Sequence, residues 1–290
     1  MLRYKNQDRD LFSRNDAEHA IYLEYSGSKN QSTVPDPENI GIKHLNGDGD
    51  FRSAESIELL KRADIVVTNP PFSLFREYVA QLIEYDKKFL IIGSLNAVTY
   101  NDIFKLIRAN KLWLGYGFQA GNAYFAVPNP GNYAKGVYDE ATGLVKFRNV
   151  TWFTNLDISK RHEDLILYKT YNPDAYPMYD NYDAIEVAKV EDIPGDYDGV
   201  MGVPLTFLEK HSRDQFEIVG LSGEADYPMT KKYGKKERVV DGVRMKSKTG
   251  TLRAVIRTDA FGMGTHFDVG YPVKGVYRRL FIRRKSASAT

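Results

Sequence analysis

Residues 64–83 read Asp-Ile-Val-Val-Thr-Asn-Pro-Pro-Phe-Ser-Leu-Phe-Arg-Glu-Tyr-Val-Ala-Gln-Leu-Ile, and this stretch decides the fold class. Its apolar, β-branched start predicts a strand over 64–68. Beyond Asn69-Pro70-Pro71-Phe72, apolar residues recur at 74, 75, 78, 79, 82 and 83, which predicts a helix over 73–85 with one buried stripe. A strand, a short polar loop and a helix in this order place the loop at the carboxyl edge of a parallel sheet, where open α/β folds bind ligands.

The residue types of this loop suit a planar base that carries an exocyclic amine. The Asn69 side-chain carbonyl and the Pro70 backbone carbonyl can each accept one N–H of the amine, which aims the nitrogen lone pair at a methyl donor. Pro70 and Pro71 fix φ and donate no hydrogen bond, and Phe72 offers a ring on which a base can stack. The alternative is a plain turn, since Asn-Pro favours turn initiation, but the flanking strand and helix favour the ligand site.

Further patterns along the chain indicate an α/β fold with a doubly wound, mostly parallel sheet. We expect a helix capped by Ser53 and ending at Arg62, and a second helix over 101–109. The predicted strands cover 20–25, 41–45, 89–93, a run buried on both faces, and 112–115. From about 116 the pattern changes to β-hairpins around a Thr142-Gly143 turn, and 171–200 is interpreted as irregular surface.

Composition excludes several classes of protein. The chain has 290 residues, 42% of them hydrophobic, and no apolar run of the ~18 residues that a membrane span needs, so we expect a cytoplasmic protein. It contains no cysteine, which excludes disulfides, cysteine-ligated zinc and thiol nucleophiles. Methyl transfer to a ring carbon of cytosine requires a cysteine nucleophile, whereas transfer to an amine does not. We expect no metal.

The charge is concentrated at the carboxyl end. From Pro228 onward, sixteen Lys and Arg residues minus four Asp and Glu residues leave +12, and the total of +2 then leaves −10 for the rest of the chain. A solvated charged face is one interpretation; a surface that follows nucleic-acid phosphates is the better one, because aromatic residues and glycines lie between the charges. Arg278, Arg279, Arg283 and Arg284 flank Leu280-Phe281-Ile282 in a strand-like stretch and are candidate nucleic-acid contacts.

Several separate segments together resemble the EcoRI-type adenine-specific DNA methyltransferases. They are the motif with its flanks, Gly47-Asp-Gly-Asp-Phe-Arg-Ser, Lys111-Leu-Trp-Leu-Gly-Tyr, Thr151-Trp-Phe-Thr-Asn-Leu-Asp, Gly202-Val-Pro-Leu-Thr-Phe-Leu and Gln215-Phe-Glu-Ile-Val-Gly. The resemblance covers nearly the whole chain. It implies S-adenosyl-L-methionine as methyl donor, a flipped adenine in double-stranded DNA as acceptor, and a restriction–modification setting.

The resemblance also assigns roles to individual residues. Asn69, Pro70, Pro71 and Phe72 match the catalytic motif, and Asp50-Phe51 matches an acidic–aromatic pair that contacts the adenine ring of the cofactor. Asp50 follows a glycine in a turn, where its carboxylate is able to accept from an exocyclic amine; an ordinary Asp-Gly turn is the alternative. Trp152 and Phe153 are candidates to stack on the flipped base or, equally, core aromatics of a hairpin.

The family pattern differs from this chain at the amino terminus. Family members carry a first strand and a cofactor loop ahead of the position that matches residue 1, and no Gly-x-Gly loop precedes Asn69 here. We therefore expect an N-terminally truncated member with an incomplete Rossmann-like methyltransferase domain over 1–170 and a basic, β-rich DNA-recognition region over 171–290. A separate polypeptide that supplies the missing segment is a candidate partner, and an apolar strand edge and face should be exposed.

Three functions stay open at this point. The first is an adenine-N6 DNA methyltransferase whose activity in this chain alone is doubtful. The second is a non-catalytic DNA-binding remnant. The third is a methyltransferase of RNA or of a protein glutamine side chain, which would use the same amide-clamping chemistry.

Overall fold

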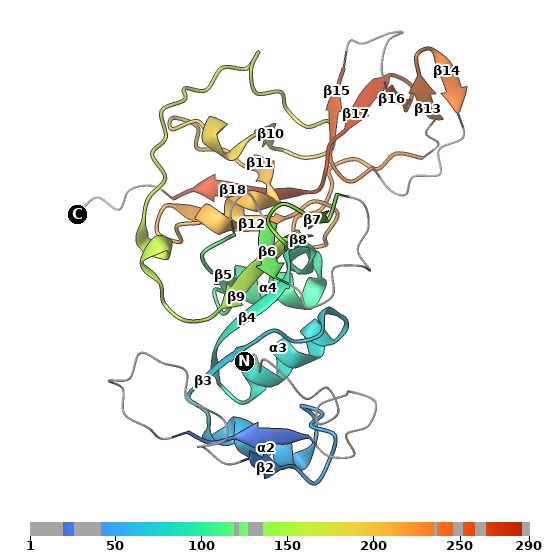
Figure 1. Ribbon diagram of the computed structural model, residues 1–290. Helices are drawn as coiled ribbons and strands as arrows, with labels where there is room; N and C mark the ends of the chain where they lie inside the picture. The colour runs from blue at the N-terminus through green and yellow to red at the C-terminus, as the bar shows by residue number, and fades with distance from the viewer. Residues whose placement is uncertain are drawn as a thin grey trace, which may run out of the picture. The chain divides into compact units, whose positions relative to one another are not determined.

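The structure is a computed structural model that describes residues 20–25, 42–118, 122–126, 136–234, 237–245, 252–258 and 265–285. Its contacts divide the chain into two compact units, Met1–Gly93 and Ser94–Thr290. Figure 1 shows helices and several sheets, so the predicted mixed α/β composition is confirmed. Within the described residues, no helix is both long and apolar enough to span a membrane.

The first unit contains a parallel strand pair joined by a helix. Its elements are β1 (Ile21–Leu23), β2 (Ile42–His44), α2 (Ala54–Arg62), β3 (Ile65–Thr68), α3 (Phe75–Glu84) and β4 (Lys88–Ser94). β3 and β4 run parallel, with Thr68 opposite Ile91, whereas β1 and β2 are antiparallel. The predicted strand–loop–helix unit is therefore present, with α3 as the crossover.

Local sequence explains both helices of this unit. The Ser53 side chain accepts a hydrogen bond from the Ser56 backbone N–H at 3.2 Å, which caps α2 as predicted. In α3 the predicted apolar stripe turns inward, and Phe75, Val79 and Leu82 are buried. Burial of this stripe stabilises α3 against the strands and fixes the orientation of the loop that precedes it.

The two strands differ in how completely they are buried. Phe89 and Ile91 of β4 are fully buried and Leu90 between them is partly exposed, so the expected burial of both faces is only partial. On β3, Ile65 and Val67 are 52% and 55% exposed. This agrees with the expectation of an exposed apolar strand face.

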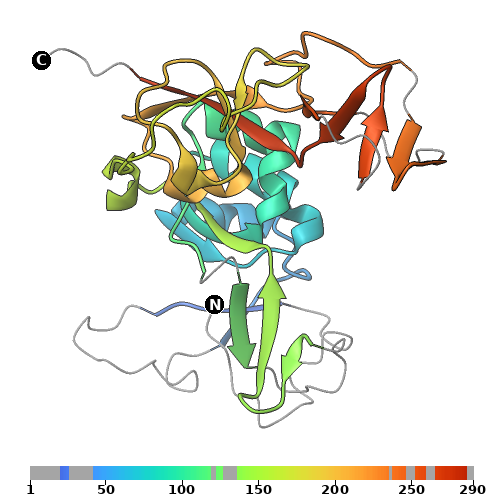
Figure 2. The same ribbon diagram turned by 90° about the horizontal axis from the view of Figure 1, so that it is seen from above.

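The second unit is mostly β-structure. Its elements are α4 (Asn101–Arg108), β5 (Trp113–Leu114), β6 (Asn122–Ala126), β7 (Tyr138–Asp139), β8 (Leu144–Arg148), β9 (Val150–Thr154), β10 (Ile185–Glu186), β11 (Met201–Pro204), β12 (Phe216–Leu221), β13 (Glu237–Val240), β14 (Val243–Met245), β15 (Val255–Arg257), β16 (Thr265–Asp268), β17 (Pro272–Gly275) and β18 (Arg279–Arg284). Apart from β5 and β9, these strands form sheets in the orders β6-β8-β7, β10-β11-β18-β12 and β14-β13-β16-β17-β15. The last two sheets are visible in Figures 1 and 2.

The strand directions agree only in part with the predicted mostly parallel sheet, since β3 and β4 are parallel whereas β1 and β2 are antiparallel. β5 runs antiparallel to β9, and the three-stranded and five-stranded sheets are antiparallel throughout. β10 and β11 form a parallel pair. Parallel neighbours need a long crossover, usually a helix, and no α-helix follows α4 in the described residues. Hairpin connections therefore dominate the second unit.

The segment 171–200 is irregular, as predicted, but only part of it is surface. Apart from β10 and a short helical turn it lacks regular structure, yet Tyr179, Tyr182 and Ala184 belong to a buried cluster with Phe281. Tyr182 also stacks on Tyr227 at 5.5 Å between ring centroids. Abundant tyrosine, which suggested a surface loop in the sequence, here fills the core through ring packing.

Candidate active site

The Asn69-Pro70-Pro71-Phe72 motif lies directly after β3. Phe72 begins a short 3-10 turn, Phe72–Leu74, that leads into α3. Pro70 is buried, whereas the Asn69 side chain is exposed and the Phe72 ring is 46% exposed. The strand and the helix thus hold the backbone of the motif while its amide and its ring stay accessible.

The hydrogen bonds of the loop leave adjacent acceptors available. The Pro71 carbonyl accepts the Leu74 backbone N–H at 2.9 Å and so belongs to the turn. No donor from the described residues reaches the Asn69 side chain or the Pro70 carbonyl. Two acceptors on successive residues without an internal donor are the groups that the predicted clamp of one amine needs.

The acidic–aromatic pair is anchored to the same helix that follows the motif. The Phe51 ring meets Tyr78 of α3 edge-on at 5.0 Å, and the Gln81 side chain donates to the Phe51 carbonyl at 3.0 Å. The structure therefore fixes the turn that carries Asp50 and Phe51 on α3. That turn and the Asn69 loop belong to one unit and share a supporting helix.

Asp50 is ionised and held in place by its neighbour. Arg52 donates from Nε to Oδ1 at 2.9 Å and from Nη2 to Oδ2 at 2.7 Å. These side-chain bonds, with the Arg52 backbone N–H, lower the pKa of Asp50 to about 2. Oδ1 accepts two hydrogen bonds from Arg52, from the backbone N–H and from Nε, whereas Oδ2 accepts one, so Oδ2 retains a lone pair that can accept from an amine.

The two aromatic candidates of β9 point to opposite faces of the strand. Phe153 is fully buried, which supports the core alternative for this residue. Trp152 is partly exposed and its ring lies 5.9 Å from that of Phe118. Strand alternation explains the difference, because adjacent residues cannot share a face.

The four arginines at the carboxyl end separate into two pairs. The Arg279 side chain is 11% exposed and donates from Nε to both Glu186 oxygens at 3.1 Å, and Arg278 pairs with Glu224. Arg283 is 48% exposed, with Glu217 at 3.9 Å, and Arg284 is partly exposed. The structure thus gives Arg278 and Arg279 internal partners, and only the other two are open to a ligand.

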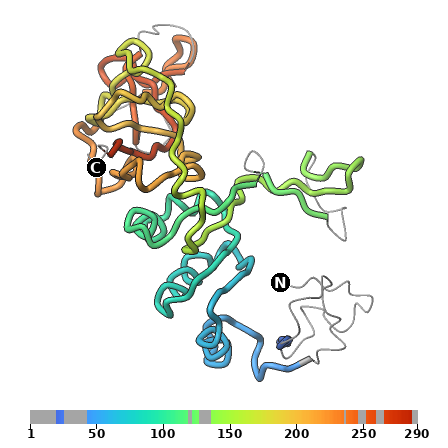
Figure 3. Tube along the Cα trace, turned by 90° about the vertical axis from the view of Figure 1, so that its left-hand side faces the viewer, coloured from blue at the N-terminus to red at the C-terminus, as the bar shows by residue number. Residues whose placement is uncertain are grey.

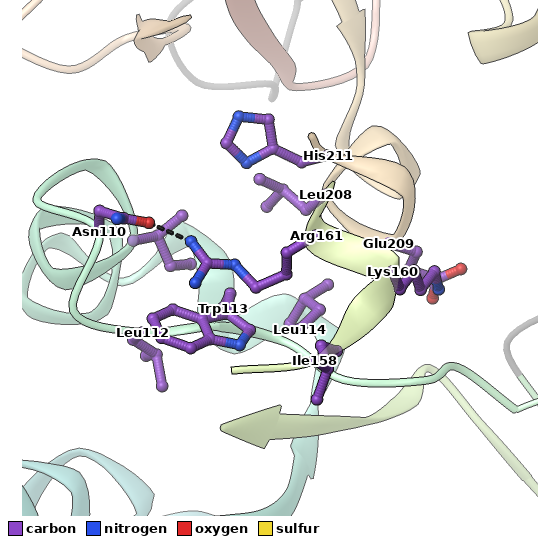
Figure 4. Close-up of a pocket in the computed structure, with 11 residues that line it drawn as sticks. Asn110, Leu112, Trp113, Leu114, Ile158, Lys160, Arg161, Leu208, Glu209 and His211 are labelled. Atoms are coloured by element: carbon purple, nitrogen blue, oxygen red, sulfur yellow. Dashed lines mark hydrogen bonds between the residues drawn. The ribbon is translucent and has the colours of Figure 1, made fainter. Parts of the chain in front are cut away.

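An arginine that the sequence did not single out lies buried in the second unit. Figure 4 shows Arg161 stacked on Trp113, 3.4 Å from the ring centroid, and hydrogen-bonded to Asn110. The hollow beside it measures about 10 Å³, room for roughly one water and far too small for a nucleoside cofactor. Arg161 and Trp113 are distant in sequence, so no local sequence pattern predicts this contact.

Comparison with known proteins identifies the family. A family model described as "Adenine-specific methyltransferase EcoRI" matches residues 2–285. The chain belongs to this family. Members with similar sequences include the Type II methyltransferase M.EcoRI of Escherichia coli, 49% identical over 220 residues, and M.MgeORF184P of Mycoplasma genitalium, 41% identical over 218 residues. A third, M.MpnI of Mycoplasma pneumoniae, is 43% identical over 184 residues. No solved structure matches the chain significantly.

Family membership confirms the predicted resemblance, and adenine-specific methyltransferase is the enzyme class of this family. The aligned segments cover 73%, 72% and 60% of this chain. They cover 67% of the E. coli relative and 64% and 57% of the two Mycoplasma relatives. The chain therefore corresponds to about two-thirds or less of these family members.

Proposed function

We propose that this chain is a site-specific adenine-N6 DNA methyltransferase of a restriction–modification system. The observation that carries the proposal is the exposed Asn69 side chain beside the Pro70 carbonyl, both without an internal donor in the described residues, at the end of β3. Family membership supports the same reaction and the same acceptor base.

In the proposed mechanism the chain positions the acceptor amine. The lone pair of an aromatic amine is delocalised into its ring, so the nitrogen is a poor nucleophile. When Asn69 Oδ1 and the Pro70 carbonyl accept its two hydrogens, the nitrogen rehybridises and its lone pair points out of the ring plane. Phe72 stacks on the extruded base and prevents it from returning to the duplex. Transfer is direct and in line, without a covalent enzyme intermediate.

We propose S-adenosyl-L-methionine as the donor, which when bound supplies an electrophilic methyl group. Asp50 and Phe51 fit its adenine moiety, because a carboxylate that is ionised above pH of about 2 accepts from the exocyclic amine and an aromatic ring packs on the base. Their attachment to α3 through Tyr78 and Gln81 keeps the pair in a fixed position relative to the motif loop. A Rossmann-like arrangement over 1–170 belongs to this proposal.

Double-stranded DNA is the proposed substrate, held in part by the region 171–290. The +12 charge after Pro228 supports this, as do the accessible Arg283 and Arg284. A groove of about 470 Å³ in the same region is lined by Arg253 and Lys274 and, among the described residues, by no acidic side chain, and Tyr277 at this groove is 89% exposed. Cations and aromatic rings together suit a nucleic-acid backbone and its bases.

The clamp is tested by Asn69→Ala. This variant should lose methyl transfer to duplex DNA by about a hundredfold or more, the scale of removing one polar group that stabilises a transition state, while DNA binding changes little. Asn101→Ala, at an exposed position of α4, is the matched control and should be unaffected. Near-normal transfer by Asn69→Ala would show that the clamp is assigned wrongly.

A further inference from the structure

The strands β6 and β8 form an antiparallel ribbon that extends from the second unit, as Figures 2 and 3 show. Its pairing register places Tyr124 opposite Lys146 and Asn122 opposite Arg148, so these four side chains share one face. The intervening residues Ala123, Phe125, Val145 and Phe147 occupy the other face. The ribbon is therefore two-sided, and its two faces differ in chemistry.

The apolar face stiffens the ribbon. Ala123 and Val145 are buried, and the Phe125 ring contacts Phe147 at 5.5 Å and Phe118 at 6.5 Å. Phe118 in turn contacts Trp152 of β9, at 5.9 Å. This chain of rings connects the ribbon to β9 and holds its backbone in place. The side chains on the opposite face therefore project from a fixed backbone.

The opposite face is cationic and aromatic. Tyr124 is 50% exposed, the Lys146 ammonium lies 5.8 Å from the centroid of its ring, and Arg148 is exposed. Neither cation has a carboxylate partner among the described residues. The same register places Asp139, opposite Leu144, on this face, and its carboxylate accepts the Ala141 backbone N–H.

We propose that this ribbon is a DNA-contacting arm, with Lys146 and Arg148 on backbone phosphates and Tyr124 against the sugars and bases between them. The major groove of B-DNA admits a two-stranded β-ribbon, and the width of two paired strands fits its opening. The charge of the face is complementary to phosphate, and an exposed tyrosine supplies a stacking surface. The inference deepens the proposed function and rests on it.

The test compares two matched charge removals in the full chain. Lys146→Gln with Arg148→Gln should weaken binding to a short DNA duplex about tenfold or more and lower the slope of log K against log salt by about 2. Lys105→Gln with Lys111→Gln removes the same charge from exposed positions outside both the ribbon and the region 171–290, and should change neither quantity. Fluorescence anisotropy over a salt series measures both, and a thermal melt establishes that each variant is folded.

Tyr124→Ala provides a second variant that leaves the charge unchanged. It should weaken duplex binding about tenfold and keep the salt slope of the unmodified chain, because a stacking contact releases no counterion. The outcomes separate the two proposals. If the unmodified chain binds and methylates DNA but all ribbon variants bind like it, the arm is disproved and the function stands. An unmodified chain that binds no duplex DNA, or binds duplex RNA more tightly, overturns both.

Discussion

At the residue scale, the proposed mechanism gives Asn69 and Phe72 separate roles. In it the amide of Asn69 accepts the hydrogens of the acceptor amine, while the ring of Phe72 stacks on the base. Pro70 is buried and contributes only its backbone carbonyl. Substitution of Asn69 should therefore affect the chemical step, and substitution of Phe72 should affect binding of the flipped base.

Phe72→Ala should weaken the complex with target DNA by about 1–3 kcal/mol, the value of one stacked base. The loss should vanish when the target position is abasic, because no base is then available to stack. Phe72→Tyr keeps the ring and should bind almost normally. Tyr168→Ala, which truncates an aromatic residue that is 68% exposed, is the control. An equal loss for Phe72→Ala on target and abasic duplexes would contradict the stacking role.

At the scale of elements, the strand β18 combines structural and accessible arginines. Leu280, Phe281 and Ile282 are fully buried in its centre. Arg279 at one end neutralises Glu186, a carboxylate that is only 7% exposed on β10. Arg283 at the other end has more than four times the exposure of Arg279 and a carboxylate only at 3.9 Å.

Arg279→Gln should accordingly lower the free energy of unfolding by about 3–5 kcal/mol, because it leaves the buried Glu186 carboxylate without its cation. Arg283→Gln should cost at most about 1 kcal/mol, since solvent screens an exposed pair, but it should weaken DNA binding. Urea unfolding and a DNA titration of both variants measure the contrast. Equal stability losses, or normal DNA binding by Arg283→Gln, would contradict this division.

Local patterns of the sequence predicted the parts of the fold that depend on neighbouring residues. The Ser53 cap, the α3 stripe and the strand before Asn69 all follow from spacing within a few residues. The errors involve distant partners. The direction of β5 depends on β9, and the burial of Arg279 depends on Glu186, far away in the chain. No periodic pattern of neighbouring residues indicates that β5 pairs with β9 or that Arg279 pairs with Glu186, so these contacts could not be predicted.

For the candidate site, the sequence singled out candidate residues but did not show which of their side chains are accessible. Trp152 and Phe153 are both aromatic, and the sequence does not distinguish their roles. Only the faces of β9 show that Phe153 is buried and Trp152 is partly exposed. The attachment of Phe51 to Tyr78 likewise emerges from tertiary packing. Such packing determines whether an aromatic ring meets a ligand or the protein core.

At the scale of the whole molecule, the charge and the motif lie in different parts of the chain. The Asn69 loop belongs to the first unit, and the +12 segment after Pro228 belongs to the second. The proposed methylation requires both parts in one reaction. The +12 segment binds the duplex, and the Asn69 loop binds a single extruded base. Only an assay of the full chain on intact duplex DNA tests them together.

The most direct measurement of the central claim is the identity of the methylated nucleoside. The full chain is incubated with S-adenosyl-L-methionine carrying a deuterated methyl group and with unmethylated duplex DNA, and the digested nucleosides are analysed by mass spectrometry. We expect label in N6-methyldeoxyadenosine and in no cytosine product. Label in a cytosine product, or no labelled nucleoside although calorimetry shows that the chain binds the cofactor, would contradict it.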